Sequence, residues 1–316
     1  MRVIFSVVIA LAVLSSRAEA EVLESFRPDG SSISILVDRP ASPGKLPILL
    51  AIDGSLCIPS SLNDQLASLA PEASGRNSYA LLVVEKPEPT HPQPEADGSY
   101  HIGPEFRCSD TFKKYYTLEQ RVLDHLSALA HLRKHADWWD GRLFIWGFSD
   151  GARIASRVGV FSPETGRMVL GGFGGGTSMA HDLESMMCAD SEQPDTCRAD
   201  FHTQTEKIRA NPTHLESWLG DANTYATWAS RLDAVEANVL KEARFPVLLF
   251  HGTEDNSVPV SSARALAAAL GAPQGTVVYH EIEGMGHGLG SGLPEDEALA
   301  LQGRFLDWLL MDKTDH

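Results

Sequence analysis

The sequence predicts an α/β domain in which buried strands alternate with helices, and three observations support this. Short apolar runs of strand length end at glycine, proline or polar residues. These runs are 45–52, 79–84, 143–146, 167–172 and 245–250. Apolar side chains recur at helical spacing along 116–135, which predicts a long amphipathic helix. Finally, the run that ends at Trp146 passes through a tight turn at Ser149 into a helical pattern over 152–160. Further helices are expected at 62–69, 263–270 and 296–310, and further strands at 32–37 and 276–282.

The turn at Ser149 has the sequence Gly147-Phe148-Ser149-Asp150-Gly151. So sharp a turn between a strand and a helix forces strained backbone angles on its central residue and pushes that side chain out over the sheet edge. Glycines two residues to either side let the neighbouring backbones pass without a Cβ clash. The pattern is a G-x-S-x-G nucleophile elbow in its strand–turn–helix context, so Ser149 is the predicted nucleophile.

A nucleophilic serine needs a base to take its proton and an acid to orient that base. Asp255 lies in the polar loop after the apolar run 245–250, and His287 lies in the glycine-rich loop that follows the alternating run 276–282. The order Ser, Asp, His is the order of the elbow families. The alternative is that Asp255 caps a turn and His287 is an ordinary loop histidine. All three residues occur in series in the expected local contexts, which favours a catalytic triad.

With these motifs, the chain resembles the α/β-hydrolase superfamily, in particular its dienelactone-hydrolase and prolyl-oligopeptidase-like branches. The resemblance rests on the elbow, on H-G-T-x-D-x-x-V-P over 251–259 and on G-x-G-H-G over 284–288. It implies an α/β-hydrolase fold, with a mostly parallel central sheet flanked by helices. It also implies that Ser149, His287 and Asp255 act as nucleophile, base and orienting acid, with no metal or organic cofactor. The target would be an ester, a thioester or a short peptide bond.

The loop after the apolar run 45–52 is where this fold supplies one N–H of the oxyanion hole, the other coming from the residue after the nucleophile. Gly54 permits a close backbone approach, so the N–H groups of Ser55 and Asp150 are the candidate donors. The family usually has His-Gly at this point, whereas this chain has Asp53-Gly54, which leaves the loop donor open. An ordinary strand-end turn is the alternative.

An insertion of about 65 residues, 177–242, separates two core strands that this fold normally joins by a single helix. The family carries a cap over its pocket at such a place. Trp218, Tyr225 and Trp228 lie in the insertion. They could line an acyl or side-chain pocket, or they could pack a small core of the cap itself.

Residues 1–20 are expected to be a signal peptide rather than part of the fold. Arg2 supplies a positive start, an apolar run extends from Val3 to Leu14, and Ala18-Glu19-Ala20 is a small-x-small cleavage site. The run is short for a membrane span, which needs about 20 apolar residues. Cleavage after Ala20 would export residues 21–316 to a periplasm or to the outside. An uncleaved N-terminal anchor is the alternative.

The 4 cysteines all lie beyond residue 20 and fit an oxidising compartment. Cys188 and Cys197 are close in a polar stretch that suits a local disulfide, which leaves Cys57 to pair with Cys108. A zinc site is the competing interpretation. No C-x-x-C motif and no histidine at ligand spacing supports it.

The composition, with a formal net charge of −16, opposes binding to nucleic acid or to anionic lipid, and no basic cluster offsets it. The expected partner is a small-molecule acyl substrate, and the oligomeric state is left open. We expect an exported hydrolase of carboxylic esters. The alternatives are a peptidase of the prolyl-oligopeptidase-like type, a catalytically silent fold used for binding, and a cofactor-free perhydrolase using the same triad.

Overall fold

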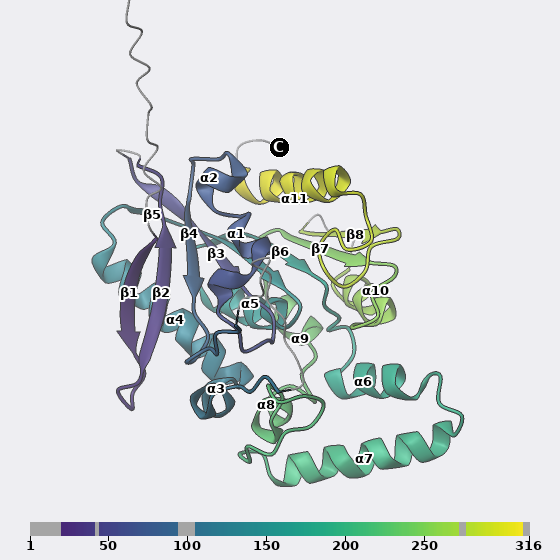
Figure 1. Ribbon diagram of the computed structural model, residues 1–316. Helices are drawn as coiled ribbons and strands as arrows, with labels where there is room; N and C mark the ends of the chain where they lie inside the picture. Colours follow the sequence, from purple (N-terminus) through teal and green to yellow (C-terminus); the bar gives the residue numbers. More distant parts are fainter. Residues whose placement is uncertain (1–19, 42–43, 94–104, 272–275, 312–316) are drawn as a thin grey trace, which may run out of the picture.

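A computed structural model describes residues 20–41, 44–93, 105–271 and 276–311. Its centre is an eight-stranded sheet with the order β1-β2-β4-β3-β5-β6-β7-β8 (Figure 1). The strands are β1 (Glu21–Phe26), β2 (Ser32–Asp38), β3 (Leu46–Ile52), β4 (Ala80–Val84), β5 (Trp139–Phe148), β6 (Thr165–Gly171), β7 (Val247–Gly252) and β8 (Val277–Ile282). β1, β2 and β4 pair antiparallel, and every pair from β4 to β8 is parallel. The prediction of a mostly parallel sheet flanked by helices is therefore confirmed.

The inner parallel strands, such as β3, β4, β6 and β7, are buried because helices cover both faces of the sheet, whereas the edge strand β8 is partly exposed. β3 shows this directly: Ile48, Leu50 and Ile52 belong to one apolar core, and Leu49 and Ala51 belong to the other. Successive side chains of a strand point to opposite faces, so a continuous apolar run fills both cores at once. This is why the strands could be recognised as unbroken apolar runs.

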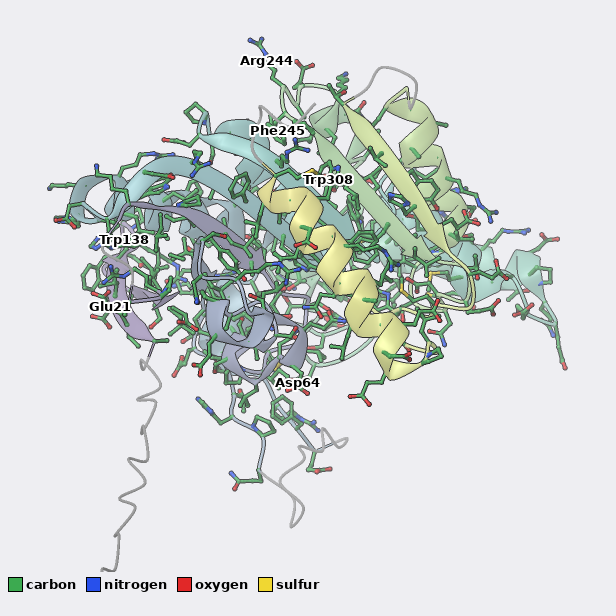
Figure 2. All side chains as sticks on the ribbon, turned by 90° about the horizontal axis from the view of Figure 1, so that it is seen from above. Glu21, Asp64, Trp138, Arg244, Phe245 and Trp308 are labelled. Carbon is green, nitrogen blue, oxygen red and sulfur yellow. A yellow bond between two sulfur atoms is a disulfide. The ribbon has the colours of Figure 1, made fainter. Side chains whose placement is uncertain are left out.

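One core lies under α4 (Leu118–His135), α5 (Asp150–Phe161), α9 (Ala237–Leu240) and α10 (Val260–Ala269). The other lies under α1 (Asp64–Ala67) and α11 (Glu295–Leu310), with α2 (Pro71–Ser74) nearby. Figure 2 shows α11 lying across the strands, with Trp308 toward its C-terminal end. The guanidinium of Arg167, on β6, lies 5.1 Å from the centre of the Trp308 ring.

The insertion between β6 and β7 consists of α6 (Met179–Cys188), α7 (Pro194–Ala210), α8 (Tyr225–Ala229) and the short α9. In Figure 1, α6, α7 and α8 lie at the end of the sheet away from α11. They share a small apolar core of their own, to which Ile208, Tyr225, Trp228 and Leu232 contribute. The segment predicted as a cap is thus a helical layer with its own packing.

The cysteines form the two disulfides expected from their spacing, Cys188–Cys197 and Cys57–Cys108. The first joins the end of α6 to the start of α7. The second ties the loop after β3 to the segment before α3 (Asp110–Tyr115). Since all four thiols are in disulfides, none remains as a zinc ligand.

Local polar contacts shift several predicted boundaries. The helix expected at 62–69 is split into a 3-10 turn (Ser60–Leu62) and α1, because the Asn63 side chain accepts from Gln65 N and Leu66 N and starts a new helix. Thr117 likewise caps α4 and separates it from α3. β1 had no strand pattern to reveal it: Val22 and Phe26 are exposed on this edge strand.

The predicted signal peptide lies outside the described residues except for Ala20. Among the helices that the structure describes, none is long and apolar enough to span a bilayer.

Candidate active site

Ser149 stands between β5 and α5 with φ 54° and ψ −127°, one of few non-glycine residues with positive φ in the described chain. The two elbow glycines make this conformation possible. A Cβ on Gly147 would lie 2.6 Å from the Ala155 Cβ, and one on Gly151 would lie 2.2 Å from the Ile52 carbonyl oxygen. No real Cβ tolerates such distances, so both positions require glycine and the strained serine is held by its surroundings.

The three residues predicted as a triad meet at the carboxyl ends of the parallel strands. His287 Nε2 is 3.0 Å from Ser149 Oγ, and His287 Nδ1 is 2.9 Å from Asp255 Oδ2. Ser149 follows β5, Asp255 follows β7 and His287 follows β8. The carboxyl ends of parallel strands lie at one edge, which is how residues 138 positions apart reach hydrogen-bond distance.

Asp255 is buried and well supplied with donors. Its Oδ1 accepts from the backbone N–H groups of Ser257, at 2.8 Å, and Val258, at 2.9 Å. Burial acts to raise the pKa of Asp255. The hydrogen bond and charge of His287 and the two backbone donors outweigh it, so the pKa lies below its ordinary value. Asp255 is therefore an anion at neutral pH, as an orienting acid must be.

His251 is a further member of this cluster that the sequence motif contained but to which no role was given. It is fully buried at the end of β7, with Nε2 3.1 Å from the Val258 carbonyl and 3.2 Å from Asp255 Oδ2. Burial lowers its pKa, so the ring is neutral at pH 7. Nε2 faces two acceptors, whereas Nδ1 has no hydrogen-bond partner among the described residues, which favours the proton on Nε2. His251 thus donates into the loop that holds Asp255.

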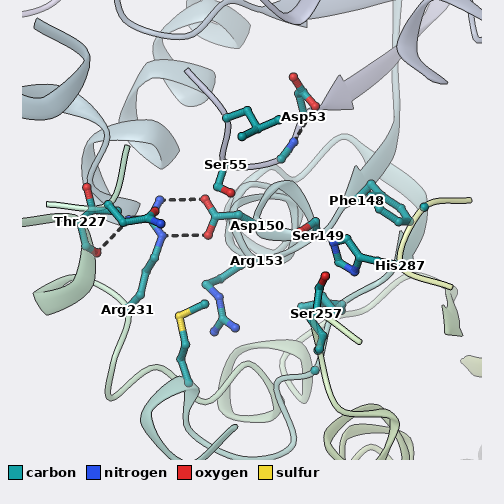
Figure 3. Close-up of a pocket in the computed structure, with 18 of the residues that line it drawn as sticks. Asp53, Ser55, Phe148, Ser149, Asp150, Arg153, Thr227, Arg231, Ser257 and His287 are labelled. Atoms are coloured by element: carbon teal, nitrogen blue, oxygen red, sulfur yellow. Dashed lines mark hydrogen bonds and ion pairs between the residues drawn. The ribbon is translucent and has the colours of Figure 1, made fainter. Parts of the chain in front are cut away.

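The candidate oxyanion loop lies against the nucleophile. A Cβ built on Gly54 would be 3.6 Å from Ser149 Cβ and 3.9 Å from its Oγ. Within the described chain, neither Ser55 N nor Asp150 N donates to another protein atom, so both are free for a ligand. Asp150 N also stands at the N-terminus of α5, where the helix dipole is positive. Ser55 and Asp150 remain the candidate donors, and both line the pocket in Figure 3.

Asp53 precedes Gly54 in the candidate oxyanion loop, and its contacts explain how the loop is held. Asp53 Oδ1 accepts from Gly54 N at 2.7 Å and from Asn63 Nδ2 at 2.6 Å. Its Oδ2 pairs with Lys86 Nζ at 2.5 Å in a buried ion pair. A carboxylate with these donors fixes the backbone conformation at Gly54.

The Asp150 side chain is clamped by Arg231, which comes from the insertion. Arg231 Nε and Nη2 contact Asp150 Oδ1 and Oδ2 at 2.8 and 2.9 Å (Figure 3). Tyr116 Oη lies 3.1 Å from Oδ2. Burial acts to raise the pKa of Asp150, but the Arg231 charge and hydrogen bonds bring it below its ordinary value. The sequence contained no signal for this pair, whose members are 81 residues apart.

A pocket of about 490 Å³ opens over Ser149 and His287. One wall comes from the loops at the sheet edge, and the other comes from the insertion, including Met179, Leu183 and Trp228. Trp228 both lines this pocket and packs in the core of the insertion, where Trp218 meets it edge to face at 5.5 Å. Of the three aromatic residues with two open interpretations, only Trp228 is among those that line the pocket, whereas Tyr225 and Trp218 pack within the insertion.

Solved structures share this architecture over nearly the whole chain. A cold-adapted esterase from an Arctic intertidal metagenomic library aligns with a TM-score of 0.54 at 16% identity, covering 92% of this chain and 93% of its own. A protein from Klebsiella pneumoniae assigned as a dienelactone hydrolase aligns with a TM-score of 0.57 at 16% identity, covering 93% and 99%. The acylaminoacyl peptidase of Pyrococcus horikoshii aligns with a TM-score of 0.61 at 14% identity, covering 94% of this chain but 42% of the peptidase.

These likenesses establish an α/β-hydrolase fold. The model of the prolyl oligopeptidase family matches residues 168–313, the part of the chain that holds Asp255 and His287. No curated protein matches the sequence. The chain therefore has an α/β-hydrolase fold, and its C-terminal part is similar to the prolyl oligopeptidase family.

Proposed function

We propose that this protein hydrolyses carboxylic esters through an acyl-enzyme formed on Ser149. The observation that carries the proposal is the pair of hydrogen bonds at His287, 3.0 Å to the Ser149 hydroxyl and 2.9 Å to the Asp255 carboxylate. A neutral imidazole in this position accepts the serine proton at Nε2, while the carboxylate holds the other proton on Nδ1 and stabilises the imidazolium that forms.

The reaction divides into two acyl transfers. Ser149 Oγ bonds to the acyl carbon as its proton passes to His287 Nε2, and the N–H groups of Ser55 and Asp150 donate to the oxyanion. Collapse breaks the bond between the acyl carbon and the alcohol oxygen, and His287 gives its proton to the departing alcohol. Water then attacks the acyl-enzyme, its proton passes to His287 and from there to Ser149, and the acid leaves.

Two features support an ester rather than a peptide as the substrate. The esterase and the dienelactone hydrolase assignment correspond to this chain over 93% and 99% of their own lengths, whereas the peptidase corresponds over 42%. The pocket, at about 490 Å³, is of the size that takes a small molecule. Peptide hydrolysis by the same triad is the second candidate, favoured by the match to the prolyl oligopeptidase family.

The first test is the intact mass of the purified protein before and after a fluorophosphonate probe, with Ser149→Ala alongside. One adduct on the wild type and none on the variant is the expected result. A folded wild type that does not react would refute an activated serine and favour a binding protein. Turnover of fluorogenic esters alone would support ester hydrolysis, and turnover of aminopeptidase or dipeptidyl substrates alone would contradict it.

We also propose export. The two disulfides fit an oxidising compartment, and residues 1–20 have the pattern of a signal peptide. The mass of the protein recovered from the native compartment tests this, because cleavage after Ala20 leaves Glu21 as the first residue. A mass that includes the first 20 residues would contradict it.

A further inference from the structure

Two arginines, Arg153 and Arg231, are among the described residues that line the pocket. They differ in how many of their N–H groups have an acceptor in the protein. All three nitrogens of Arg231 donate to protein acceptors. Its Nε and Nη2 contact Asp150, and its Nη1 contacts the carbonyls of Tyr116 and Thr227 and the hydroxyl of Ser230. With its donors occupied by the fold, Arg231 is a structural cation.

Arg153 is different. Its side chain is 5% exposed, yet it has one acceptor in the described chain: Nη1 donates to Glu236 Oε1 at 2.5 Å. Nε and Nη2 have no acceptor there and are not among the polar atoms sealed from solvent, so they face the pocket whose wall Arg153 forms. Figure 3 shows its guanidinium extending into the pocket rather than toward the Asp150–Arg231 pair. A buried guanidinium with open donors is prepared for an acceptor from a ligand.

The carboxylates near Arg153 are largely occupied by other cations. The carboxylates of the described lining residues are Asp53 and Asp150, and each is matched by a buried cation, Lys86 and Arg231. Glu236, which is fully buried, is shared by Arg153 and Arg157. Since Arg153 shares its carboxylate partner with a second arginine, a carboxylate that enters the pocket would meet donors that no described carboxylate occupies.

The place of Arg153 indicates which part of the substrate carries the anion. Arg153 lies four residues after Ser149 on α5, one turn along the same face, or roughly 6 Å along the helix axis. The leaving group must depart next to His287, which protonates it, and His287 and Arg153 lie on different sides of Ser149 in Figure 3. The apolar side chains of Met179, Leu183 and Trp228 line the insertion side of the pocket.

We propose that Arg153 binds a carboxylate at the far end of the acyl group, so that the preferred substrates are half-esters of dicarboxylic acids. This inference rests on the proposed ester hydrolysis and names its substrate class. An aliphatic chain would run along the apolar wall from the acyl carbon at Ser149, and its terminal carboxylate would accept from Nε and Nη2 of Arg153. Such a fork-to-carboxylate contact is geometrically specific as well as strong.

The test compares kcat/KM for the 4-nitrophenyl half-esters of succinate, glutarate and adipate with that for the same compounds whose distal carboxylate is methyl-capped. The wild type is expected to prefer one anionic member of the series by roughly ten- to a hundredfold, the range of a hydrogen bond to a charged group. Arg153→Met should remove that preference and Arg153→Lys should retain part of it. The ratio of kcat/KM for the anionic and the methyl-capped ester is insensitive to a general loss of activity, because such a loss affects both substrates equally.

Arg157→Met is the matched control, because it removes a cation from the same Glu236 without changing the described lining of the pocket. Its preference ratio should equal that of the wild type. An equal loss in Arg157→Met and Arg153→Met would overturn the assignment of the anion to Arg153. A preference for a carboxylate on the alcohol part instead would overturn its assignment to the acyl part.

A binding measurement separates this inference from the proposed function. Calorimetry of monomethyl glutarate, which keeps one carboxylate, against dimethyl glutarate, which keeps none, with Ser149→Ala and with Ser149→Ala/Arg153→Met, reports the anion site without catalysis. If the monoester binds only when Arg153 is present, and the wild type takes no fluorophosphonate label, the ester hydrolysis is refuted and the anion site stands. Ester turnover with no preference in the wild type, and no binding of monomethyl glutarate, would refute the anion site alone.

Discussion

Arg231→Met is expected to destabilise the protein by about 3–5 kcal/mol at neutral pH, because it leaves Asp150 as a buried carboxylate without its cation. The side chains in this pair are 2% and 6% exposed, so solvent screens little of the loss. What remains near Asp150 among the described residues is the Tyr116 hydroxyl at 3.1 Å and the charge of Arg153. For a chain of this size, such a loss corresponds to a fall in Tm of roughly 5–10 °C.

The pH dependence of this loss has a definite sign. In the wild type the pKa of Asp150 is lowered, so its contribution to stability is present above the ordinary carboxyl pKa and is lost as pH falls through the folded value. In Arg231→Met, burial without the cation would raise the pKa of Asp150, so the carboxyl would take up a proton as the pH falls from 7. The difference in Tm between wild type and variant should therefore be largest at neutral pH and smaller in acid.

Thermal unfolding followed by circular dichroism between pH 5 and 8 measures this difference. Asp150→Asn/Arg231→Met is the matched control, since it removes both charges and keeps an acceptor for Tyr116. This double variant should recover most of the Tm. A deficit that is the same at every pH, or a double variant as unstable as Arg231→Met, would refute the electrostatic explanation and point to lost packing of the insertion.

Three further predictions concern the elbow, the acid and a disulfide. Gly151→Ala should abolish fluorophosphonate labelling while the far-UV circular dichroism spectrum stays native. The reason is that its Cβ would lie 2.2 Å from a backbone carbonyl oxygen at the end of β3. Normal labelling would show that the elbow can relax. His251→Leu should lower kcat roughly tenfold with little change in KM, by removing a donor to the Asp255 loop. An unchanged kcat would contradict a contribution of His251 to the Asp255 loop. Replacing Cys57 and Cys108 by alanine should cost about 4 kcal/mol in urea unfolding, given a sequence separation of 51; an unchanged free energy of unfolding would contradict the chain-entropy account.

The candidate triad was predictable because each of its members has a local signature. Ser149 stands between two glycines at a strand–helix turn, and Asp255 and His287 each follow an apolar or alternating run. Parallel strands bring such loop positions to one edge whatever the length of chain between them. Local pattern and strand order were therefore sufficient to predict the three residues, and His287 lies within hydrogen-bond distance of the other two.

The disulfides were predictable for a related reason, since four cysteines allow few pairings and two of them are near neighbours in the chain. The ends of the helices were harder to predict from the sequence. Asn63 divides a segment that periodicity alone predicts as one helix, because side-chain capping competes with helix continuation. β1 was missed because Val22 and Phe26 are exposed and only Leu23 packs against the core, so its apolar residues do not alternate as in a half-buried strand.

The sequence by itself determined the alternation of strands and helices, the nucleophile elbow and the order of the triad residues, since these depend on neighbours within a few positions. Only the tertiary structure decided which charges meet. Asp53 forms an ion pair with Lys86, and Asp150 forms one with Arg231. Nε and Nη2 of Arg153 face the pocket, whereas its Nη1 donates to Glu236. Long-range ion pairs follow from packing rather than periodicity. The sequence around an arginine does not show which distant carboxylate the folded chain will bring next to it. The character of the pocket, as distinct from the chemistry at Ser149, is thus a property of the folded chain.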